Sequence, residues 1–355
     1  MSKTLHTGII GFGMAGQIFH APFISTLPGF RLAKISTANP QFVEKARQRY
    51  PETTIVADAQ GILDDPDIDL VIVGTPNEAH APLATAALRQ GKHVIVEKPF
   101  TITTQEADAL MKVAKQENRL LSVHHNRRFV ADYQTVKKVI DSGLLGNLVE
   151  YETHYDRFRP AFKQKAWRET AIPGAGILYD LGSHLIDQAL MLFGLPDFVT
   201  ADVRIQRPGG HADDHFALTL DYSGLKVTLK ATMLAKKPGP HFMLHGDRGS
   251  FVKYGADVQE ADLNAGLTPA NTPHWGIEPE SNWGRFAVDF QGMQLEGSIQ
   301  SERGCFQDYF VNVRQAIFGE AELIVKPEHS RNTIRIIELA LLSQQARQTV
   351  AYSHG

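Results

Sequence analysis

The sequence predicts an α/β protein with a doubly wound parallel sheet, followed by a second domain. Three observations support this prediction. A strand pattern at residues 7–10 opens into a glycine-rich turn, strand and helix patterns then alternate, and an apolar run at residues 94–96 ends abruptly in an acid, a lysine and a proline. A chain of 355 residues is long enough for two domains of ordinary size.

The turn after the first strand reads Gly11-Phe12-Gly13-Met14-Ala15-Gly16, and an apolar helical pattern follows from Ile18. In dinucleotide-binding folds of the Rossmann type, the first glycine permits the tight turn and the second lets a pyrophosphate approach the backbone. The third lets helix and strand pack closely. Such turns also occur without a ligand, but a position between strand and helix favours binding. The expected dinucleotide contacts are Gly11, Phe12, Gly13, Met14 and Ala15.

The elements that follow have the order that a doubly wound sheet requires. Strands are predicted at residues 31–36, near 55, and at 70–73, 94–96 and 120–124, with helices from 40, over about 79–90, and from 103. Gly91 ends the second of these helices, and Thr103 and Glu106 have the spacing of a capping box at the start of the third. We expect a dinucleotide-binding domain over residues 1–124 and a substrate-binding domain over 125–355.

The stretch after the second strand indicates which dinucleotide is bound. A ribose-binding acid is expected about 20 residues beyond the glycines, but the chain there reads Ser36-Thr37-Ala38-Asn39. An acid would repel a 2′-phosphate, so its absence favours NADP, with Ser36 and Thr37 as contacts. No arginine stands immediately beside this stretch, and NAD remains the less favoured alternative.

Two further strand ends carry candidate cofactor contacts. The strand at 70–73 ends in turn residues that would face the same crevice as the glycine turn, which makes Thr75, Pro76, Asn77 and His80 candidates. The strand at 94–96 ends in Glu97-Lys98-Pro99. Because proline removes a donor and restricts the residue before it, Lys98 is held where open α/β sheets keep their ligands, although an ordinary surface corner has the same pattern.

A second group of chemically active residues lies in the C-terminal part of the chain. Asp180, His184 and Asp187 follow a glycine-rich stretch at spacings that place them on one face of a helix ending at Gly194. A histidine on a helix is often structural, but an aspartate one turn earlier favours a positioned acid or base.

A metal site is the other interpretation of an aspartate and a histidine at this spacing. His124 and His125 are adjacent on a predicted strand and therefore point to opposite faces, so they cannot serve one ion together. We expect no metal.

Composition excludes several other functions. The chain carries 36 Lys and Arg against 39 Asp and Glu, so no basic field points to nucleic acid or acidic membranes. The single cysteine, Cys305, excludes an internal disulfide and a cysteine-built metal site. No apolar run approaches membrane-spanning length and no leader precedes the first strand, so we expect a cytoplasmic protein.

The glycine turn, Glu97-Lys98-Pro99, Asn126-Arg127-Arg128 and the Asp180-x-Gly-x-His184 stretch together resemble the Gfo/Idh/MocA oxidoreductase family over almost the whole chain. Within that family, the acid-free second strand and the stretches 125–129 and 178–188 are most similar to NADP-dependent scyllo-inositol dehydrogenases.

The resemblance implies a C-terminal α+β domain with a large open, mostly antiparallel sheet. Family members pair subunits through this sheet, so a homodimer or homotetramer is expected. Strand compositions agree at residues 148–155, 198–206, 215–222, 225–233 and 241–245. An irregular loop is predicted over 263–283 and a final amphipathic helix over about 330–346.

The resemblance also implies reversible hydride transfer between a nicotinamide and a carbinol carbon of a cyclic polyol or sugar. His184 would take the hydroxyl proton, Asp180 would hold its ring, and Lys98 would stabilise the developing alkoxide. Asn126, Arg127 and Glu97 join the implied cofactor contacts. The candidate substrate contacts are Lys98, Arg127, Tyr155, Arg157, Arg168, Asp180 and His184.

Two alternatives to a polyol dehydrogenase remain open. The chain could be a keto-sugar reductase of the same family, or an NADP-binding redox sensor without turnover. The presence of Lys98, Asp180 and His184 together weighs against the sensor, because a binder that does no chemistry has no need of all three.

Overall fold

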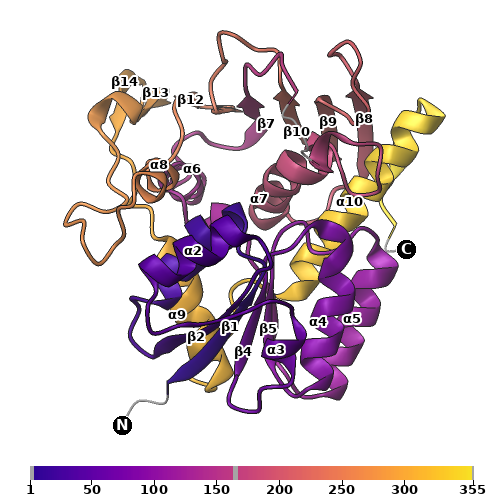
Figure 1. Cartoon of the computed structure of the whole chain (residues 1–355). Coiled ribbons are helices and arrows are strands. Elements are labelled where there is room, and N and C mark those ends of the chain that lie inside the picture. The colour runs from indigo at the N-terminus through magenta and orange to yellow at the C-terminus, as the bar shows by residue number, and fades with distance from the viewer. Residues whose placement is uncertain (1–3, 163–166, 354–355) are drawn as a thin grey trace. The chain divides into compact units, whose positions relative to one another are not determined.

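The computed structural model describes residues 4–162 and 167–353 (Figure 1). The chain forms two compact units, and each is assembled from segments far apart in the sequence. The first unit contains the chain up to Asn126, Gln259–Trp275 and Cys305–Arg331. The second unit contains Arg127–Val258, Gly276–Gly304 and the residues from Asn332 onward.

A parallel sheet forms the centre of the first unit, as the alternating patterns predicted. Within the described residues it has six strands in the order β3-β2-β1-β4-β5-β6, and all neighbours run parallel. This doubly wound order confirms the predicted fold class. The strands are β1 (Leu5–Ile10), β2 (Phe30–Ser36), β3 (Thr54–Val56), β4 (Leu70–Val73), β5 (His93–Val96) and β6 (Leu121–Val123).

Helices follow each strand of this sheet, and α4 packs against β4, β5 and α5 (Figure 1). The predicted capping box at Thr103 is present, since its side chain accepts from the Glu106 N–H while Glu106 reaches back. Three helices of the described residues, at Gln60–Leu63, Gln259–Asn264 and Phe306–Ile317, were not predicted. The helical segments are η1 (Ala15–His20), α1 (Ala21–Ile24), α2 (Pro40–Arg49), α3 (Gln60–Leu63), η2 (Asn77–Ala79), α4 (His80–Arg89), α5 (Thr104–Gln116), α8 (Gln259–Asn264) and α9 (Phe306–Ile317).

A mixed sheet dominates the second unit. Its nine described strands have the order β14-β13-β12-β11-β7-β10-β9-β8-β15, and only the β7–β10 pair is parallel. The mostly antiparallel sheet is therefore confirmed. The strands are β7 (Leu148–Asp156), β8 (Phe198–Arg204), β9 (His215–Tyr222), β10 (Leu225–Thr232), β11 (Phe242–Gly246), β12 (Gly249–Lys253), β13 (Gly284–Phe290), β14 (Met293–Ile299) and β15 (Val350–Ala351).

Strands β12, β13 and β14 were not predicted, and the expected loop over 263–283 was only partly right. Helix α8 occupies its start, and a short turn, η6 (Glu280–Asn282), lies near its end. Trp275 is fully buried and donates from its indole nitrogen to Gln259 Oε1 at 3.0 Å, which anchors the segment. Burial of a tryptophan with its polar atom satisfied stabilises otherwise irregular chain.

The helix predicted to carry Asp180 and His184 is present but does not begin as an α-helix. It starts as a π-helical turn, η5 (Leu178–Gly182), and continues as α7 (Ser183–Phe193). Gly194 ends α7 with a positive φ of 76°, as predicted. The remaining helical segments are η3 (Asn126–Phe129), α6 (Ala131–Asp141), η4 (Trp167–Glu169) and α10 (Pro327–Ala346).

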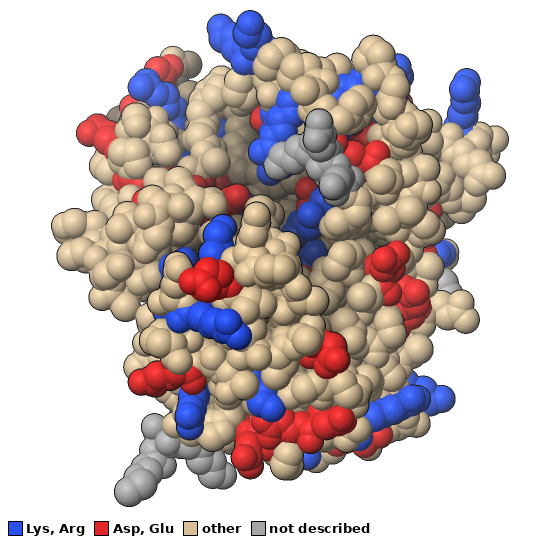
Figure 2. Space-filling view, viewed as in Figure 1, with Lys and Arg blue, Asp and Glu red and all other residues tan. Residues whose placement is uncertain are grey.

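Charge on the drawn face of the molecule is mixed, with Lys and Arg interspersed among Asp and Glu (Figure 2). This distribution agrees with the formal net charge of −3. Among the helices of residues 4–162 and 167–353, none is long and apolar enough to span a membrane.

The capping box gives a test of local stability. Replacing Thr103 with Ala removes the acceptor for the Glu106 N–H, and we expect the free energy of unfolding to fall by about 1 kcal/mol. Urea denaturation measures this change. Gln105→Ala, at an exposed position of the same helical turn, is the control, and an equal loss in both variants would contradict the capping role.

Candidate functional site

The register of the parallel sheet brings three loops to one edge of the first unit. Ile10 is paired with Val73 and Val73 with Val96, so the residues after each strand stand side by side. Backbone bonds extend this alignment beyond the strands, because the Gly74 N–H donates to Ile10 O at 2.8 Å and the Glu97 N–H to Val73 O at 3.0 Å. The carboxyl ends of parallel strands are where such sheets bind ligands.

The glycine turn has the geometry of a phosphate cradle. Gly11 has a φ of 94°, and a Cβ there would lie 2.6 Å from Gly74 O, so only glycine fits against the neighbouring loop. A Cβ at Gly16 would lie 2.5 Å from Gly11 O. At Gly13, in contrast, a Cβ would meet nothing within 4 Å, which leaves open space where a dinucleotide pyrophosphate approaches in this fold. The residues of the glycine turn therefore fit a dinucleotide pyrophosphate.

The other predicted contacts in this turn differ in exposure. Phe12 is buried and packs edge-on against Tyr50, with 6.3 Å between ring centroids. Only its backbone is available to a ligand. Met14 is 62% exposed, and Ala15 begins the helical segment η1.

The end of β2 contains no acid, as the sequence shows. Ser36 is buried, and Thr37 Oγ1 accepts from the Asn39 N–H at 3.4 Å. Asn39 caps α2 by accepting from the Gln41 N–H at 2.9 Å. The first turn of α2 contains no acid, so no carboxylate there would repel a phosphate.

The loop after β4 is tied to the loop after β5 by a buried histidine. His80 Nδ1 lies 2.9 Å from Pro99 O and its Nε2 lies 3.0 Å from Thr75 O. Both partners are acceptors, so a neutral imidazole donates to one of them at a time. Burial lowers the pKa of His80. Of the other predicted contacts here, Pro76 is exposed and Asn77 is buried.

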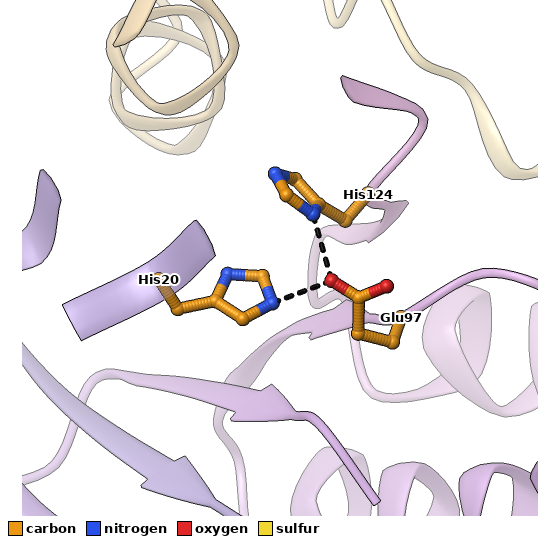
Figure 3. A group of neighbouring side chains, drawn as sticks. All are labelled: His20, Glu97 and His124. Carbon is orange, nitrogen blue, oxygen red and sulfur yellow. Dashed lines mark hydrogen bonds and ion pairs between the residues drawn. The ribbon is translucent and has the colours of Figure 1, made fainter. Parts of the chain in front are cut away.

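Glu97 is the centre of a buried cluster at the end of β5 (Figure 3). Its Oε1 accepts from His20 Nε2 at 2.7 Å and from His124 Nδ1 at 2.8 Å. Burial by itself would raise the pKa of Glu97, but the two histidines more than offset this and hold it well below its usual range. Lys98, the predicted catalytic lysine, follows and is half-buried. Asn126 is buried at the end of this unit.

In the second unit, an aspartate from a distant loop positions the segment that carries Asp180 and His184. Asp213 Oδ2 accepts from the Leu178 N–H at 2.7 Å, and its carbonyl oxygen accepts from the Ile177 N–H at 3.0 Å. A Cβ at Gly176 would lie 1.9 Å from Asp213 Oδ1, so the glycine-rich stretch serves this close approach.

Asp187 does not face a substrate. Its carboxylate forms a two-pronged ion pair with Arg128, at 2.8 Å to Nε and 2.6 Å to Nη2, and both side chains are buried. Nearby, Gln188 donates to Arg127 O at 2.8 Å. These bonds join α7 to the segment 127–128 and fix the helix on which His184 stands.

His184 is buried and packs edge-on against Tyr155, with 6.3 Å between ring centroids. The ring centroids of Tyr155 and His241 are 5.0 Å apart. His241 Nδ1 in turn lies 3.1 Å from Asp132 Oδ2. His241 and Asp132 were missed by the sequence analysis. His241 immediately precedes β11 and Asp132 lies in α6, and no spacing in the sequence links them to His184.

Asp180 has a cationic neighbour, Arg168. Arg168 Nε lies 3.3 Å from Asp180 Oδ1, and the Arg168 guanidinium also stacks on Trp167 at 4.5 Å. Two of the predicted substrate contacts, Arg168 and Tyr155, are therefore next to the predicted catalytic pair. Arg157 is half-buried at the end of β7.

Comparison with known protein families finds two consecutive matches along the chain. Residues 5–125 match the NAD-binding Rossmann fold of the oxidoreductase family, and residues 137–352 match its C-terminal alpha/beta domain. The chain belongs to the Gfo/Idh/MocA oxidoreductase family. The resemblance deduced from the motifs is thus confirmed.

Relatives of known sequence and structure cover the chain almost completely. It is 40% identical over 356 residues to the oxidoreductase YdgJ of Escherichia coli, with 99% of both chains covered. It is 38% identical over 351 residues to the scyllo-inositol 2-dehydrogenase (NADP(+)) IolW of Bacillus subtilis, covering 99% of this chain and 97% of that one. The solved structure of the Bacillus subtilis oxidoreductase YvaA matches with a TM-score of 0.95 and 37% identity, over 99% of each chain.

Removing the carboxylate of Asp187 should destabilise the second unit strongly. Asp187→Asn leaves the buried Arg128 charge without its anion, and we expect a loss of about 3 kcal/mol in the free energy of unfolding, measured by urea denaturation. Asp141→Asn, which breaks the exposed pair with Lys137, should cost less than about 0.5 kcal/mol. Similar losses in the two variants would contradict the proposed role.

Asp213 should make stability depend on pH. Burial, helped by the Asp214 carboxylate, raises the pKa of Asp213 to about 6 against the opposing backbone N–H of Leu178. The native state therefore holds this proton more tightly than the unfolded state, where the pKa is about 3.9. The stability that Asp213 contributes is fully present below pH of about 4 and is lost as the pH rises through 6.

The measurement compares the protein with Asp213→Asn. The difference in unfolding free energy, wild type minus variant, should decrease between pH 4 and pH 7. Asp221→Asn, at an exposed position of β9, is the control. A difference that stays constant or increases over this range would show that Asp213 is not held protonated by burial.

Proposed function

We propose that this protein is an NADP-dependent oxidoreductase that transfers a hydride between the nicotinamide and a CH–OH carbon of a cyclic polyol or sugar of the inositol type. The observation that carries the proposal is the arrangement of the first unit. An open glycine turn and Lys98 share one edge of a doubly wound sheet, next to the loop at Thr75. Membership of an oxidoreductase family whose relatives include a scyllo-inositol dehydrogenase supports the class of substrate.

The choice of NADP is supported by the acid-free stretch from Ser36 to Asn39. A carboxylate at this point would bind the ribose hydroxyls of NAD and repel a 2′-phosphate. The relative IolW carries NADP(+) in its name and is 38% identical to this chain. Bound NADP would supply the hydride acceptor, and it would lie along the glycine turn with Thr37 and Asn39 close to its ribose.

The chain's own residues supply the proton and charge chemistry. We propose that His184 takes the hydroxyl proton as a general base, because histidine is the side chain that most often does so in catalysis. Asp180, which pairs with Arg168, would stabilise the imidazolium. The ammonium of Lys98 would stabilise the developing alkoxide, and Tyr155 and Arg168 would bind other hydroxyl groups.

The subunit arrangement and cellular location remain predictions. We expect a homodimer or homotetramer in the cytoplasm, which light scattering and cell fractionation would establish.

The first experiment measures formation of reduced nicotinamide with NADP or NAD and a panel of scyllo-inositol, myo-inositol, glucose and xylose. We expect turnover of an inositol, with kcat/KM higher for NADP than for NAD because no acid follows β2. A preference for NAD would contradict the cofactor assignment. No turnover with either cofactor, although the cofactor binds, would favour a keto-sugar reductase or a redox sensor.

Lys98→Ala separates the enzyme from a sensor. It should lower kcat by about 100-fold or more while the dissociation constant for NADP stays nearly unchanged. Lys112→Ala, which removes an exposed lysine on α5, is the matched control and should leave both quantities alone. Unchanged turnover in Lys98→Ala would exclude the proposed role of the lysine.

A further inference from the structure

We propose that Glu97, held by His20 and His124, is a positioning residue that fixes the main chain of Lys98 for the reaction. This inference rests on the proposed function for one point, which is that the reaction is the hydride transfer proposed above. The three side chains come from the helical segment after the glycine turn, from the end of β5 and from the end of β6 (Figure 3). They lie in the first unit and are all buried.

The two oxygens of Glu97 have different partners. Oε1 accepts both histidine bonds, whereas Oε2 accepts from the backbone N–H of Lys98 at 3.1 Å. The carboxylate therefore connects two rings of the core with the main chain of the proposed catalytic lysine. One residue further, Pro99 O lies 2.9 Å from His80 Nδ1, so the chain is held at the Lys98 N–H and again at the peptide group that follows Pro99.

The hydrogen bonds to Glu97 determine which ring nitrogens of His20 and His124 carry a proton. Carboxylate oxygens only accept, so the proton of His20 must be on Nε2 and that of His124 on Nδ1. The opposite nitrogens, His20 Nδ1 and His124 Nε2, are buried and have no hydrogen-bond partner. A second proton on either ring would be a buried donor without an acceptor, which is costly. Burial lowers the pKa of His20, and Glu97 carries the negative charge of the cluster.

Aromatic packing keeps water away from the cluster. The His20 and His124 rings are 4.4 Å apart, and Phe310 of α9 lies 5.9 Å from the first and 5.4 Å from the second. Tyr309 lies edge-on to His124 at 4.9 Å. Because the two imidazole rings are closely packed, they hold the Glu97 carboxylate in one orientation. Movement of this carboxylate would also move the Lys98 peptide that is bonded to it.

The same three side chains have the atom types of a metal site, since their ligand atoms all lie within 4.8 Å of one another. Zinc bonds to nitrogen and oxygen are about 2.0–2.2 Å long, so an ion would have to enter between atoms that are now in hydrogen-bond contact. The distances of 2.7 and 2.8 Å to one shared oxygen favour protons in those positions. Metal content is nevertheless a direct test.

Two substitutions separate the hydrogen bonds of Glu97 from its charge. Glu97→Leu keeps the volume but removes every acceptor. Glu97→Gln removes the charge, yet its amide oxygen can accept from Lys98 and its NH2 group can donate to both rings. This arrangement requires each histidine to adopt the opposite tautomer, which puts its proton on the nitrogen that has no partner and should lower the stability of the variant. The bond to the Lys98 N–H is kept, so the conservative variant should still hold the main chain of Lys98.

The experiment measures hydrogen exchange of the Lys98 amide, kcat with the preferred polyol, and the NADP dissociation constant. In Glu97→Leu we expect fast exchange and a kcat lower by about 100-fold, as for misplacement of a catalytic group, with NADP affinity retained. Glu97→Gln should exchange slowly and keep most of kcat, and its 15N histidine spectrum should show reversed tautomers of His20 and His124. Glu117→Leu, at an exposed position at the end of α5, is the control.

Several results would overturn the proposal. Slow Lys98 exchange or unchanged kcat in Glu97→Leu would show that the carboxylate does not position the lysine. A Glu97→Gln variant with slow exchange but as little turnover as Glu97→Leu would show that charge rather than position matters. A stoichiometric metal in the wild-type protein, lost in Glu97→Leu, would replace the network with a metal site. If no polyol or sugar is turned over, the proposed function fails. Hydrogen exchange of the Lys98 amide and the tautomers of His20 and His124 would still show whether Glu97 holds the main chain of Lys98.

Discussion

The parallel pairing of β1, β4 and β5 is the constraint on which the first unit depends. Parallel strands must be joined by crossovers on the faces of the sheet, so consecutive strand ends return to the same edge. The register from Ile10 through Val73 to Val96 then aligns the glycine turn, the Gly74 loop and Glu97. Strand β4 and residues 94–96 of β5 are apolar and buried because both faces of the sheet are covered, and the candidate polar groups follow where these strands end.

Buried polar groups must satisfy one another, and this requirement organises the candidate residues within each unit. In the first unit, Glu97 is acceptable in the interior because three N–H groups surround it. In the second unit, Asp187 neutralises Arg128, and Asp213 accepts the Leu178 backbone N–H. In each case an interior carboxylate fixes a segment that carries a proposed catalytic residue, so stability and function depend on the same bonds.

The predictions succeeded where the signal was local. The capping box at Thr103 joins residues three apart, and the β-strand at Leu70–Val73 was found because four apolar residues end in turn chemistry. Strands β13 and β14 were missed because many of their side chains are exposed and give little alternation. The π-helical start at Leu178 was missed because it follows from the bond to Asp213, 35 residues away.

The sequence by itself determined the doubly wound sheet, the family, and the candidate residues at the strand ends, because each depends on residues close together in the chain. Only the tertiary structure placed His20 and His124 on Glu97, since the first of these contacts spans 77 residues and the second 27. It also assigned Asp187 to Arg128, 59 residues away, where helical spacing alone grouped it with Asp180 and His184. Partners of buried charges are chosen by packing in three dimensions, and no sequence period records that choice.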